Sequence, residues 1–278
     1  MKKRLKTLGT HAFLCLLGFL MIYPILWLFF APFKTNQEIL GSIALFPETY
    51  TFSAFAEGWR GTGQYTFSVF TLNTLRLVLP TIAFTALSSV VVAYGFARFD
   101  FAFKKPLFGL MIATLMLPNA VIIIPRYILF TRIGWHDSYL PFIIPALLAC
   151  NPFFIFMMTQ FFRGLPRALD ESARIDGCSS FGILLHILVP LCKPAVISVM
   201  LFQMIWTWND FFNSLIFISS VRKYTLPLAL KMTLDNEAAV NWAKVLAMSC
   251  VSIFPLVLVF FLAQKYFVEG IATTGLKG

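Results

Sequence analysis

Charged side chains are scarce in this 278-residue sequence. Asp, Glu, Lys and Arg make up 12% of it, whereas they make up roughly a quarter of an average soluble domain. Hydrophobic residues account for 59%, and the mean hydropathy is +0.82. A soluble domain of this size could not bury so much apolar surface. The excess is therefore expected to face lipid.

Five stretches of 20 to 27 residues contain no charged side chain at all: 7–33, 77–97, 106–125, 138–162 and 245–264. A helix needs about 20 mainly apolar residues to cross the hydrocarbon core of a bilayer, so each stretch is a candidate span. A sixth candidate, 194–218, carries one charge, Asp210. The sequence therefore predicts an all-α integral membrane protein with six transmembrane helices.

The N-terminal tail is basic. Its first six residues include Lys2, Lys3, Arg4 and Lys6 and no acidic residue. Cytoplasmic segments of membrane proteins carry an excess of Lys and Arg, so the N-terminus is predicted to be cytoplasmic, and six spans return the C-terminus to the same side. Anionic lipid and this topology explain the net charge of +10 without a nucleic-acid partner.

Three parts of the chain follow from this topology. Residues 1–70 hold the tail, the first span and an outer loop, 71–265 form a core of five helices with a long cytoplasmic loop at 163–193, and 266–278 are a cytoplasmic tail. Prolines inside the third and fourth spans predict bent helices, because proline removes a backbone donor. Such helices either line a cavity or serve irregular packing.

Groups suited to chemistry are also missing. The five cysteines are scattered, with neither a C-x-x-C pair nor metal-ligand spacing, so we interpret them as small apolar residues. The three histidines belong to different parts of the predicted topology. The segment GIATTGLK at 270–277 lacks the Ser or Thr and the flanking elements of a phosphate-binding loop. We therefore expect no catalytic residue, metal site or bound cofactor in this chain.

The loop between the fourth and fifth spans is the most informative segment. Residues 165–190 read LPRALDESARIDGCSSFGILLHILVP. The proline at the second position suits the first turn of a helix, and Gly177 suits a left-handed stop. Ser179 or Ser180 can cap a second short helix, expected at 181–188. The segment is therefore predicted to form two helices separated by a glycine.

Charge spacing within the first of these helices predicts two ion pairs. Arg167 with Glu171, and Asp170 with Arg174, stand four residues apart. Helices this short are marginal in water by themselves. The loop must therefore lie on the membrane, pack against its own helices or dock into another protein.

The E-A-A-x3-G-x9-I-x-L-P signature of binding-protein-dependent ABC importer permeases resembles this loop, through Glu171, Ala173, Gly177, Ile187 and Pro190. Ser172 and Val189 stand where the signature has Ala and Leu. WTWNDFFNSLIFI at 206–218 and the ending QKYFVEGIATTGLKG look like the smaller membrane subunit of carbohydrate importers of the maltose type. The resemblance covers roughly 71–278 and implies the type I ABC importer permease fold.

In that family the loop is the coupling element that sits in a cleft of an ATPase subunit. The resemblance therefore implies ATPase contact through Asp170, Glu171, Ser172, Ala173, Asp176, Gly177 and Pro190. It also implies a second permease subunit, an ATPase dimer that holds ATP and magnesium, and an extracellular or periplasmic solute-binding protein. Thr274, Gly275 and Lys277 would insert between the ATPase subunits, unless the tail is disordered. The chain would lie in a bacterial inner or cytoplasmic membrane.

Asp210 is the only charge within the fifth predicted span. An ionised carboxylate at the centre of a spanning helix costs about 3 kcal/mol unless it faces partners or water, so Asp210 is a candidate functional residue. Trp206, Trp208, Asn209 and Asn213 add stacking faces and amides, which suit a sugar. We predict that these residues border the outer part of a substrate pathway. The alternative is that Asp210 and Asn209 form structural hydrogen bonds to neighbouring helices and that Trp206 and Trp208 pack at a subunit interface.

Three further expectations concern function. By the same resemblance, the outer loop 219–241 reaches toward the binding protein, or else its charges are simply solvated. The expected solute is an oligosaccharide, with a monosaccharide or a glycerol-phosphate-like compound as alternatives. An ion-coupled secondary transporter would show repeats and several ionisable groups at the bilayer midplane, and an intramembrane enzyme would show clustered catalytic groups. Carbohydrate import driven by a separate ATPase is therefore favoured.

Overall fold

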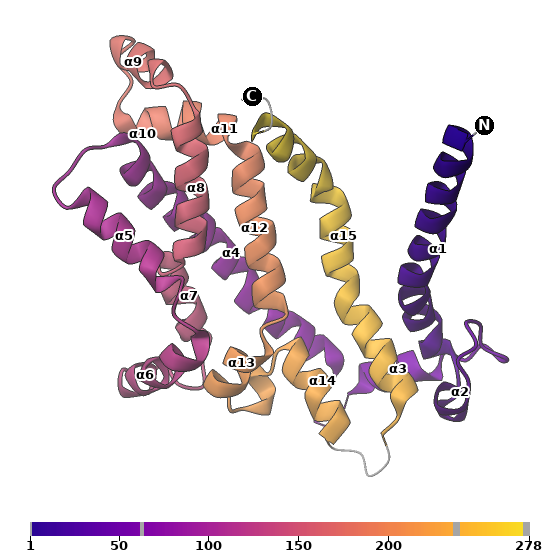
Figure 1. Ribbon diagram of the computed structural model, residues 1–278. Coiled ribbons are helices and arrows are strands. Elements are labelled where there is room, and N and C mark those ends of the chain that lie inside the picture. The colour runs from indigo at the N-terminus through magenta and orange to yellow at the C-terminus, as the bar shows by residue number, and fades with distance from the viewer. Residues whose placement is uncertain (1, 62–63, 236–239, 275–278) are drawn as a thin grey trace. The chain divides into compact units, whose positions relative to one another are not determined.

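The computed structural model describes residues 2–61, 64–235 and 240–274, and every regular element within these ranges is helical (Figure 1). The predicted all-α fold is confirmed. The chain forms two compact units. The first consists of Met1–Val69 and Ala229–Pro255, and the second of Phe70–Leu228 and Leu256–Gly278.

The first unit begins with a helix that is apolar around its whole circumference. α1 (Lys2–Phe30) continues into η1 (Ala31–Phe33), and residues 9–33 are long and apolar enough to cross a membrane. Side chains such as Phe13, Leu16 and Leu20 are more than half exposed. A helix that is hydrophobic on all sides requires lipid or another apolar chain around it. The position agrees with the predicted first span.

Two shorter helices, α2 (Asn36–Gly41) and α3 (Ser53–Arg60), follow in the first unit. α3 packs against α15 (Trp242–Thr274) where Gly58 faces the buried Met248. A Cβ atom placed on Gly58 would lie 2.7 Å from Met248 Cγ. The close approach of these two helices therefore depends on the missing side chain at residue 58.

A Gly58→Val substitution is expected to lower the stability of the first unit by about 1–3 kcal/mol, because the added methyl groups overpack a filled interface. Thermal unfolding of the detergent-solubilised protein measures the change. Gly95→Val is the matched control, since a Cβ atom at Gly95 meets no atom of the residues that the structure describes within 4 Å. Equal melting temperatures for the two variants would contradict the packing argument.

The second unit is built around α4 (Phe67–Arg98), a helix of 32 residues that corresponds to the predicted second span. The next three predicted spans are each interrupted. Their pieces are α5 (Lys104–Thr114) and α6 (Asn119–Arg132), then α7 (Leu140–Leu147) and α8 (Pro152–Gly164), then α12 (Lys193–Trp208) and α13 (Phe211–Phe217). The axes of α5 and α6 differ by 101°.

Each interruption has a local cause. Pro118 is extended and precedes α6, while Pro152 is the first residue of α8, after Ala149 has taken a left-handed conformation (φ 59°). Proline cannot donate the backbone hydrogen bond that would continue a preceding helix. The break within the predicted fifth span, 194–218, falls at Asp210, whose carboxylate caps α13. The bend predicted from proline is confirmed for the third span, and the fourth span is interrupted between Leu147 and Pro152. The break at Asp210 was not predicted.

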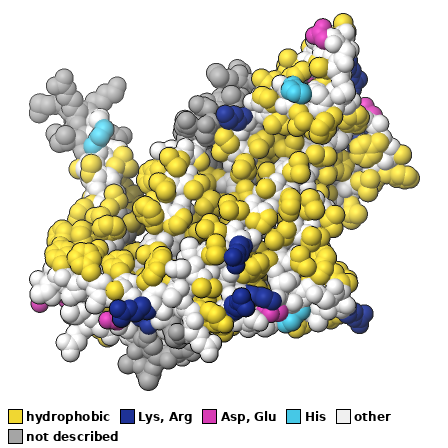
Figure 2. Space-filling view, turned by 180° about the vertical axis from the view of Figure 1, so that it is seen from behind, with side chains coloured by type: hydrophobic (Ala, Val, Ile, Leu, Met, Phe, Trp, Pro, Cys, Tyr) yellow, Lys and Arg dark blue, Asp and Glu magenta, His cyan; other side chains and the backbone are white. Residues whose placement is uncertain are grey.

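Four described helical segments are long and apolar enough to cross a membrane. Two bent pairs of helices also qualify if each pair is counted as one span, namely Lys104–Thr114 with Asn119–Arg132 and Ser180–Leu191 with Lys193–Trp208. Among the described residues this gives up to six spans, in agreement with the predicted number. Figure 2 shows hydrophobic side chains over much of the visible surface, where charged side chains are few. Apolar surface of this extent is typical of a protein solvated by lipid.

One hydrophobic cluster organises the second unit. It joins buried residues of α4, α8 and α12 to those of the loop between α8 and α12, including Ala173, Ile183 and Leu188. The loop therefore packs against its own helices. Its elements are α9 (Ala168–Ile175), α10 (Ser180–Ile183), the π-helical turn η2 (Leu184–Leu188) and α11 (Val189–Leu191); α14 (Leu226–Asp235) follows further along the chain.

Candidate functional site

The loop between α8 and α12 has the predicted arrangement of two helices separated by a glycine. α9 ends at Ile175, and Gly177 adopts φ +81°, a conformation that suits glycine. Ser179 precedes α10, and its hydroxyl accepts a hydrogen bond from Gly182 N at 3.1 Å. Of the two predicted caps, Ser179 is therefore the one used.

The predicted ion pairs within α9 are wrong. Asp170 faces inward and pairs with Arg98, the last residue of α4, with Nε 3.1 Å from Oδ2. No ion pair between described residues joins Arg167 to Glu171 or Asp170 to Arg174. Spacing along a helix indicates which residues share a face, but the packing of α9 on α4 gave Asp170 a partner outside its own helix.

The residues predicted to contact an ATPase divide into two groups. Asp170 and Ala173 are buried against the rest of the second unit. Exposed residues form the second group: Glu171, Ser172, Asp176, Gly177 and Pro190. Large apolar side chains of the same loop are exposed as well, namely Ile175 (87%), Phe181 (63%) and Leu185 (44%). The loop therefore has an inner face fixed to α4 and an outer face that is exposed within the described part of the chain.

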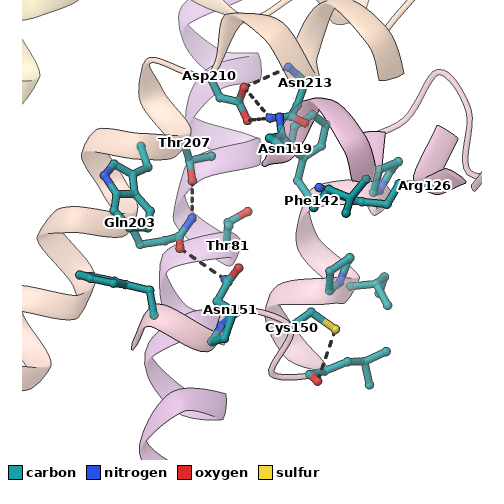
Figure 3. Close-up of a pocket in the computed structure, with 18 of the residues that line it drawn as sticks. Thr81, Asn119, Arg126, Phe142, Cys150, Asn151, Gln203, Thr207, Asp210 and Asn213 are labelled. Atoms are coloured by element: carbon teal, nitrogen blue, oxygen red, sulfur yellow. Dashed lines mark hydrogen bonds between the residues drawn. The ribbon is translucent and has the colours of Figure 1, made fainter. Parts of the chain in front are cut away.

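A cavity of about 1170 Å³ lies within the second unit. Its walls come from α4, the α5–α6 and α7–α8 breaks, α12 and α13. Figure 3 shows Asp210 and Asn213 toward one end, Cys150 toward the other, and Gln203 between them. Of the five residues predicted to border a substrate pathway, four line this cavity: Trp206, Asn209, Asp210 and Asn213. Trp208 does not line it and is buried (3% exposed).

Asp210 is held by Asn213. Its carboxylate accepts hydrogen bonds from Asn213 N at 3.0 Å and from Asn213 Nδ2 at 2.9 Å. Asn213 Oδ1 is buried and accepts no hydrogen bond from the described part of the chain. Asn209 donates its own amide to Ile205 O at 2.8 Å. These hydrogen bonds are local, within three or four residues of the chain, so they do not test the alternative prediction of bonds to neighbouring helices.

A chain of polar side chains crosses the cavity wall. Gln203 donates to Thr207 Oγ1 at 2.6 Å, and Asn151 donates to Thr85 Oγ1 at 3.0 Å and to Gln203 Oε1 at 3.4 Å. These residues come from α4, the α7–α8 break and α12. Buried amides in an apolar region persist only when hydrogen-bonded. The network therefore fixes three spanning segments to one another beside the cavity.

Aromatic and cationic groups complete the lining. Trp206 is half exposed, and its ring centroid lies 5.2 Å from that of Phe153. Arg126 of α6 lies over the rings of Phe130 and Phe217, with its guanidinium carbon 5.8 Å from each centroid. The lining thus combines stacking faces, amides and one cation, the groups that recognise polyhydroxylated solutes.

Sequence reasoning did not identify Arg126, Asn119, Asn151 or Gln203, all of which line the cavity. A signal for Arg126 was present, because its charge directly follows the apolar stretch 106–125 that predicts the third span. The amides lie within apolar runs, where any polar side chain needs a partner. Their convergence depends on the helix breaks, which bring three segments together.

The segment that follows α13 is anchored by Asp137, a residue with φ +53°. Its carboxylate accepts hydrogen bonds from Ser219 N, Ser220 N and Ser220 Oγ at 2.6–3.0 Å, and from Lys223 Nζ at 2.9 Å. Asn73 of α4 donates to the backbone carbonyls of residues 222 and 224. The first part of the predicted loop 219–241 is therefore held in place, and residues 236–239 lie outside the described residues.

This anchor is expected to make the segment that follows α13 sensitive to acid. Burial by itself would raise the pKa of Asp137, but hydrogen bonds from Ser220, Lys223 and Ser219 outweigh it and hold the pKa well below its usual 3.8. A carboxyl whose pKa is lower folded than unfolded stabilises the fold above the unfolded pKa, and this stabilisation is lost as the pH falls. The anchor is therefore expected to be intact above about pH 5 and to weaken below it.

Hydrogen exchange of residues 218–225, corrected for intrinsic rates, measures this expectation. Protection should be constant between pH 5 and 8, because this range lies above the pKa of 3.8 that an aspartate carboxyl ordinarily has when the segment is open. Protection should decrease at lower pH. An Asp137→Asn chain should exchange faster at every pH and should show no such decrease. Identical profiles for the two chains would contradict the anchoring role.

The C-terminal prediction falls largely outside the structure. Thr274 is the last residue of α15. Gly275 and Lys277 lie outside the described residues. Insertion of the tail between ATPase subunits therefore stays a prediction.

The sequence of the chain matches a known protein family. The family model for "Binding-protein-dependent transport system inner membrane component" matches residues 87–272, which is more than half of the chain. The chain therefore belongs to this family and is a permease subunit of an ABC importer. The resemblance to ABC importer permeases that was identified from residues 165–190 is confirmed. The prediction of a multi-pass membrane protein is confirmed as well.

Individual relatives resemble the chain over nearly its whole length. The arabinooligosaccharides transport system permease protein AraQ of Bacillus subtilis (strain 168) is 32% identical, with 96% of this chain and 94% of the relative covered. The polygalacturonan/rhamnogalacturonan transport system permease protein YtcP of the same organism is 27% identical, with both chains covered completely. A solved bacterial ABC transporter for the import of alginate shares the fold, with a TM-score of 0.84, 22% identity, and 96% and 98% of the two chains covered.

Proposed function

We propose that this chain is one of two membrane subunits of an ATP-driven importer for oligosaccharides. It forms half of the translocation pathway, and a second permease subunit forms the other half. It also passes conformational changes of an ATPase dimer to the helices around this pathway. ATP and magnesium are held by the ATPase. A solute-binding protein on the outer side delivers the sugar. Both termini of the chain are cytoplasmic.

The observation that carries this proposal is the two-sided loop between α8 and α12. Its inner face is fixed to α4, while Ile175, Phe181 and Leu185 are exposed beside the charged Glu171. Helices of eight and four residues are too short to be stable in water alone. Exposed apolar groups with a polar rim are typical of a protein–protein contact. An ATPase subunit is the partner that family membership favours.

The cavity supports a role in solute passage. Trp206 offers a half-exposed stacking face, and the exposed Asn119 and Asn209 contribute amides to the lining. A sugar presents apolar ring faces and many hydroxyl donors, which match these two groups. The volume of about 1170 Å³ exceeds the range of roughly 300–1,000 Å³ typical of small-molecule sites. An oligosaccharide is therefore a better match than a single small solute.

Relatives favour the same class of solute. The names of AraQ and of GanQ, a Bacillus subtilis protein 26% identical to this chain, specify arabinooligosaccharides and galactooligosaccharides. Transport by such a subunit requires two membrane conformations that the ATPase stabilises to different extents. In our proposal, closure of the ATPase dimer carries α9 and α10 with it, and the helices around the cavity move to open it outward.

Co-purification tests the proposal. The chain is expressed with its partner permease and a tagged ATPase, and the wild-type protein is expected to be recovered with the tag. Glu171→Lys should reduce recovery strongly, because it reverses an exposed charge at the contact. Lys105→Glu is the control for reversing an exposed charge elsewhere and should be recovered normally. Transport in vesicles that lack any ATPase would refute the proposal and favour a secondary transporter.

A further inference from the structure

Arg98 and Asp170 form the most deeply buried ion pair in the described part of the chain. Their side chains are only 5% and 11% exposed, whereas each of the other three pairs includes a side chain at least 45% exposed. Arg98 Nη2 also donates to Leu165 O at 3.1 Å, at the start of the loop. One guanidinium thus contacts both the entrance of the loop and its first helix.

A second contact joins α4 to the other side of the glycine break. Tyr94 stands one helical turn before Arg98, and its hydroxyl donates to Ser180 O at 3.0 Å. The Tyr94 ring also packs against Phe99 and Phe162, with centroids 5.1 and 6.4 Å away. Helix α4 therefore contacts α9 through Asp170 and α10 through Ser180, on either side of Gly177.

The energetics of such a pair favour orientation over stability. Desolvating two charges offsets most of their attraction, so an apolar pair of similar volume often stabilises a protein equally well. The loop already contributes buried apolar residues to the core of the second unit. An ion pair adds what methyl groups do not provide, an attraction between one residue of α4 and one of α9 that favours a particular rotation of α9 about its axis. Arg98 Nε and Asp170 Oδ2 lie 3.1 Å apart without being aligned as a hydrogen bond, so this attraction is electrostatic.

We propose that Arg98 and Asp170 are a positioning pair that sets the angle at which the loop presents its outer face, so that movement of the loop is passed to α4 and the cavity. This inference rests on the proposed function. It reassigns Asp170, which the sequence placed among the ATPase contacts. Asp170 acts through the orientation of α9, while Glu171 and the exposed apolar residues touch the partner.

The cavity itself provides a readout that needs no identified solute. Cys150 is exposed and lines the cavity, so its reaction with a membrane-impermeant maleimide reports on access. The other four cysteines are replaced by alanine in every variant. The complete complex, with partner permease and ATPase, is placed in nanodiscs, and labelling is compared without nucleotide and with ATP and vanadate. The parent protein is expected to show a nucleotide-dependent labelling rate.

The decisive variant replaces the pair by apolar residues, Arg98→Met with Asp170→Leu. It should fold, recover the ATPase and hydrolyse ATP, because no unpaired charge is left buried. The effect of nucleotide on Cys150 labelling should nevertheless fall about tenfold, a magnitude within the range observed for disrupted coupling between sites. The matched control is Lys104→Met with Asp100→Leu, which removes an ion pair in which Asp100 is 81% exposed, and it should behave as the parent.

Two results would overturn the inference. Parental nucleotide dependence in the apolar double variant would mean that the pair only fills space. Loss of ATPase recovery in that variant, with the protein still folded, would mean that Asp170 is itself a contact. If the double variant fails to fold, Arg98→Lys takes its place, since it keeps the charge but loses the guanidinium that contacts both Asp170 and Leu165 O. Parental nucleotide dependence in the lysine variant would equally overturn the inference, and a reduced dependence with normal ATPase recovery would support it. Failure of the parent chain to recover any ATPase would instead refute the proposed function.

Discussion

A Gly177→Pro chain is expected to reach the membrane in normal amounts and to lose ATP-dependent uptake completely. Gly177 has φ +81°, and its N–H donates to Arg174 O at 3.1 Å. Proline fixes φ near about −65° and has no N–H, so α9 and α10 cannot keep their present angle. Uptake by vesicles that contain the whole importer, together with immunodetection of the inserted chain, measures both parts of this expectation.

Graded substitutions at the same position provide the control. Asparagine adopts the left-handed backbone conformation more readily than most other residues with a side chain, whereas this conformation costs alanine about 1–2 kcal/mol of free energy. Uptake should therefore decrease from Gly to Asn to Ala to Pro. A Cβ atom at residue 177 meets no described residue within 4 Å, so crowding among the described residues does not explain such an order. Full uptake by the proline variant would show that the glycine break is not needed.

The second large effect is expected at Asp210. Asp210→Ala removes the cap of α13 and three hydrogen bonds with Asn213, which costs about 1 kcal/mol for the cap alone. The α12–α13 break forms part of the cavity wall, so its shape should change and uptake should decrease about tenfold or more. Uptake per inserted chain in the same vesicles is the measurement.

Asp210→Asn separates the charge of this residue from its capping role. The asparagine oxygen can still accept from Asn213 N, so the cap is kept while the negative charge is lost. If Asp210 acts by shaping the wall, the asparagine variant should keep most of its uptake. Uptake as low as that of the alanine variant would assign the role to the charge. Asp235→Asn, which changes an exposed acid outside the cavity, should have no effect.

The contrast between Asp170 and Asp210 illustrates what spacing along the chain can predict. Both acids were singled out from the sequence, Asp170 by a motif and Asp210 by its isolation in an apolar stretch. The motif correctly identified a glycine-broken pair of helices, because Gly177, Ser179 and the flanking prolines act through local backbone geometry. The partner of Asp170 was missed, because Arg98 is 72 positions away and belongs to another helix.

The cavity was only partly visible in the sequence. Trp206, Asn209, Asp210 and Asn213 occupy one short segment, so their grouping could be predicted from their proximity. Arg126, Asn151 and Gln203 join them only because α5–α6 and α7–α8 are broken. Proline predicted that these helices bend but not the direction in which they bend, which depends on packing against α4. Trp208, only two positions from Trp206, was assigned to the pathway but is buried instead.

The sequence by itself determined that this chain lies in a membrane, that it crosses about six times, and that it has a helical loop of the ABC importer type. Hydropathy, charge and the residues that begin and end helices act over a few neighbouring positions, so they can be read without the fold. The tertiary structure alone decided which side of that loop is free, which residues surround the cavity, and that Arg98 fixes α9. These features depend on contacts between segments far apart in the chain, and each such contact is selected by packing and burial in three dimensions.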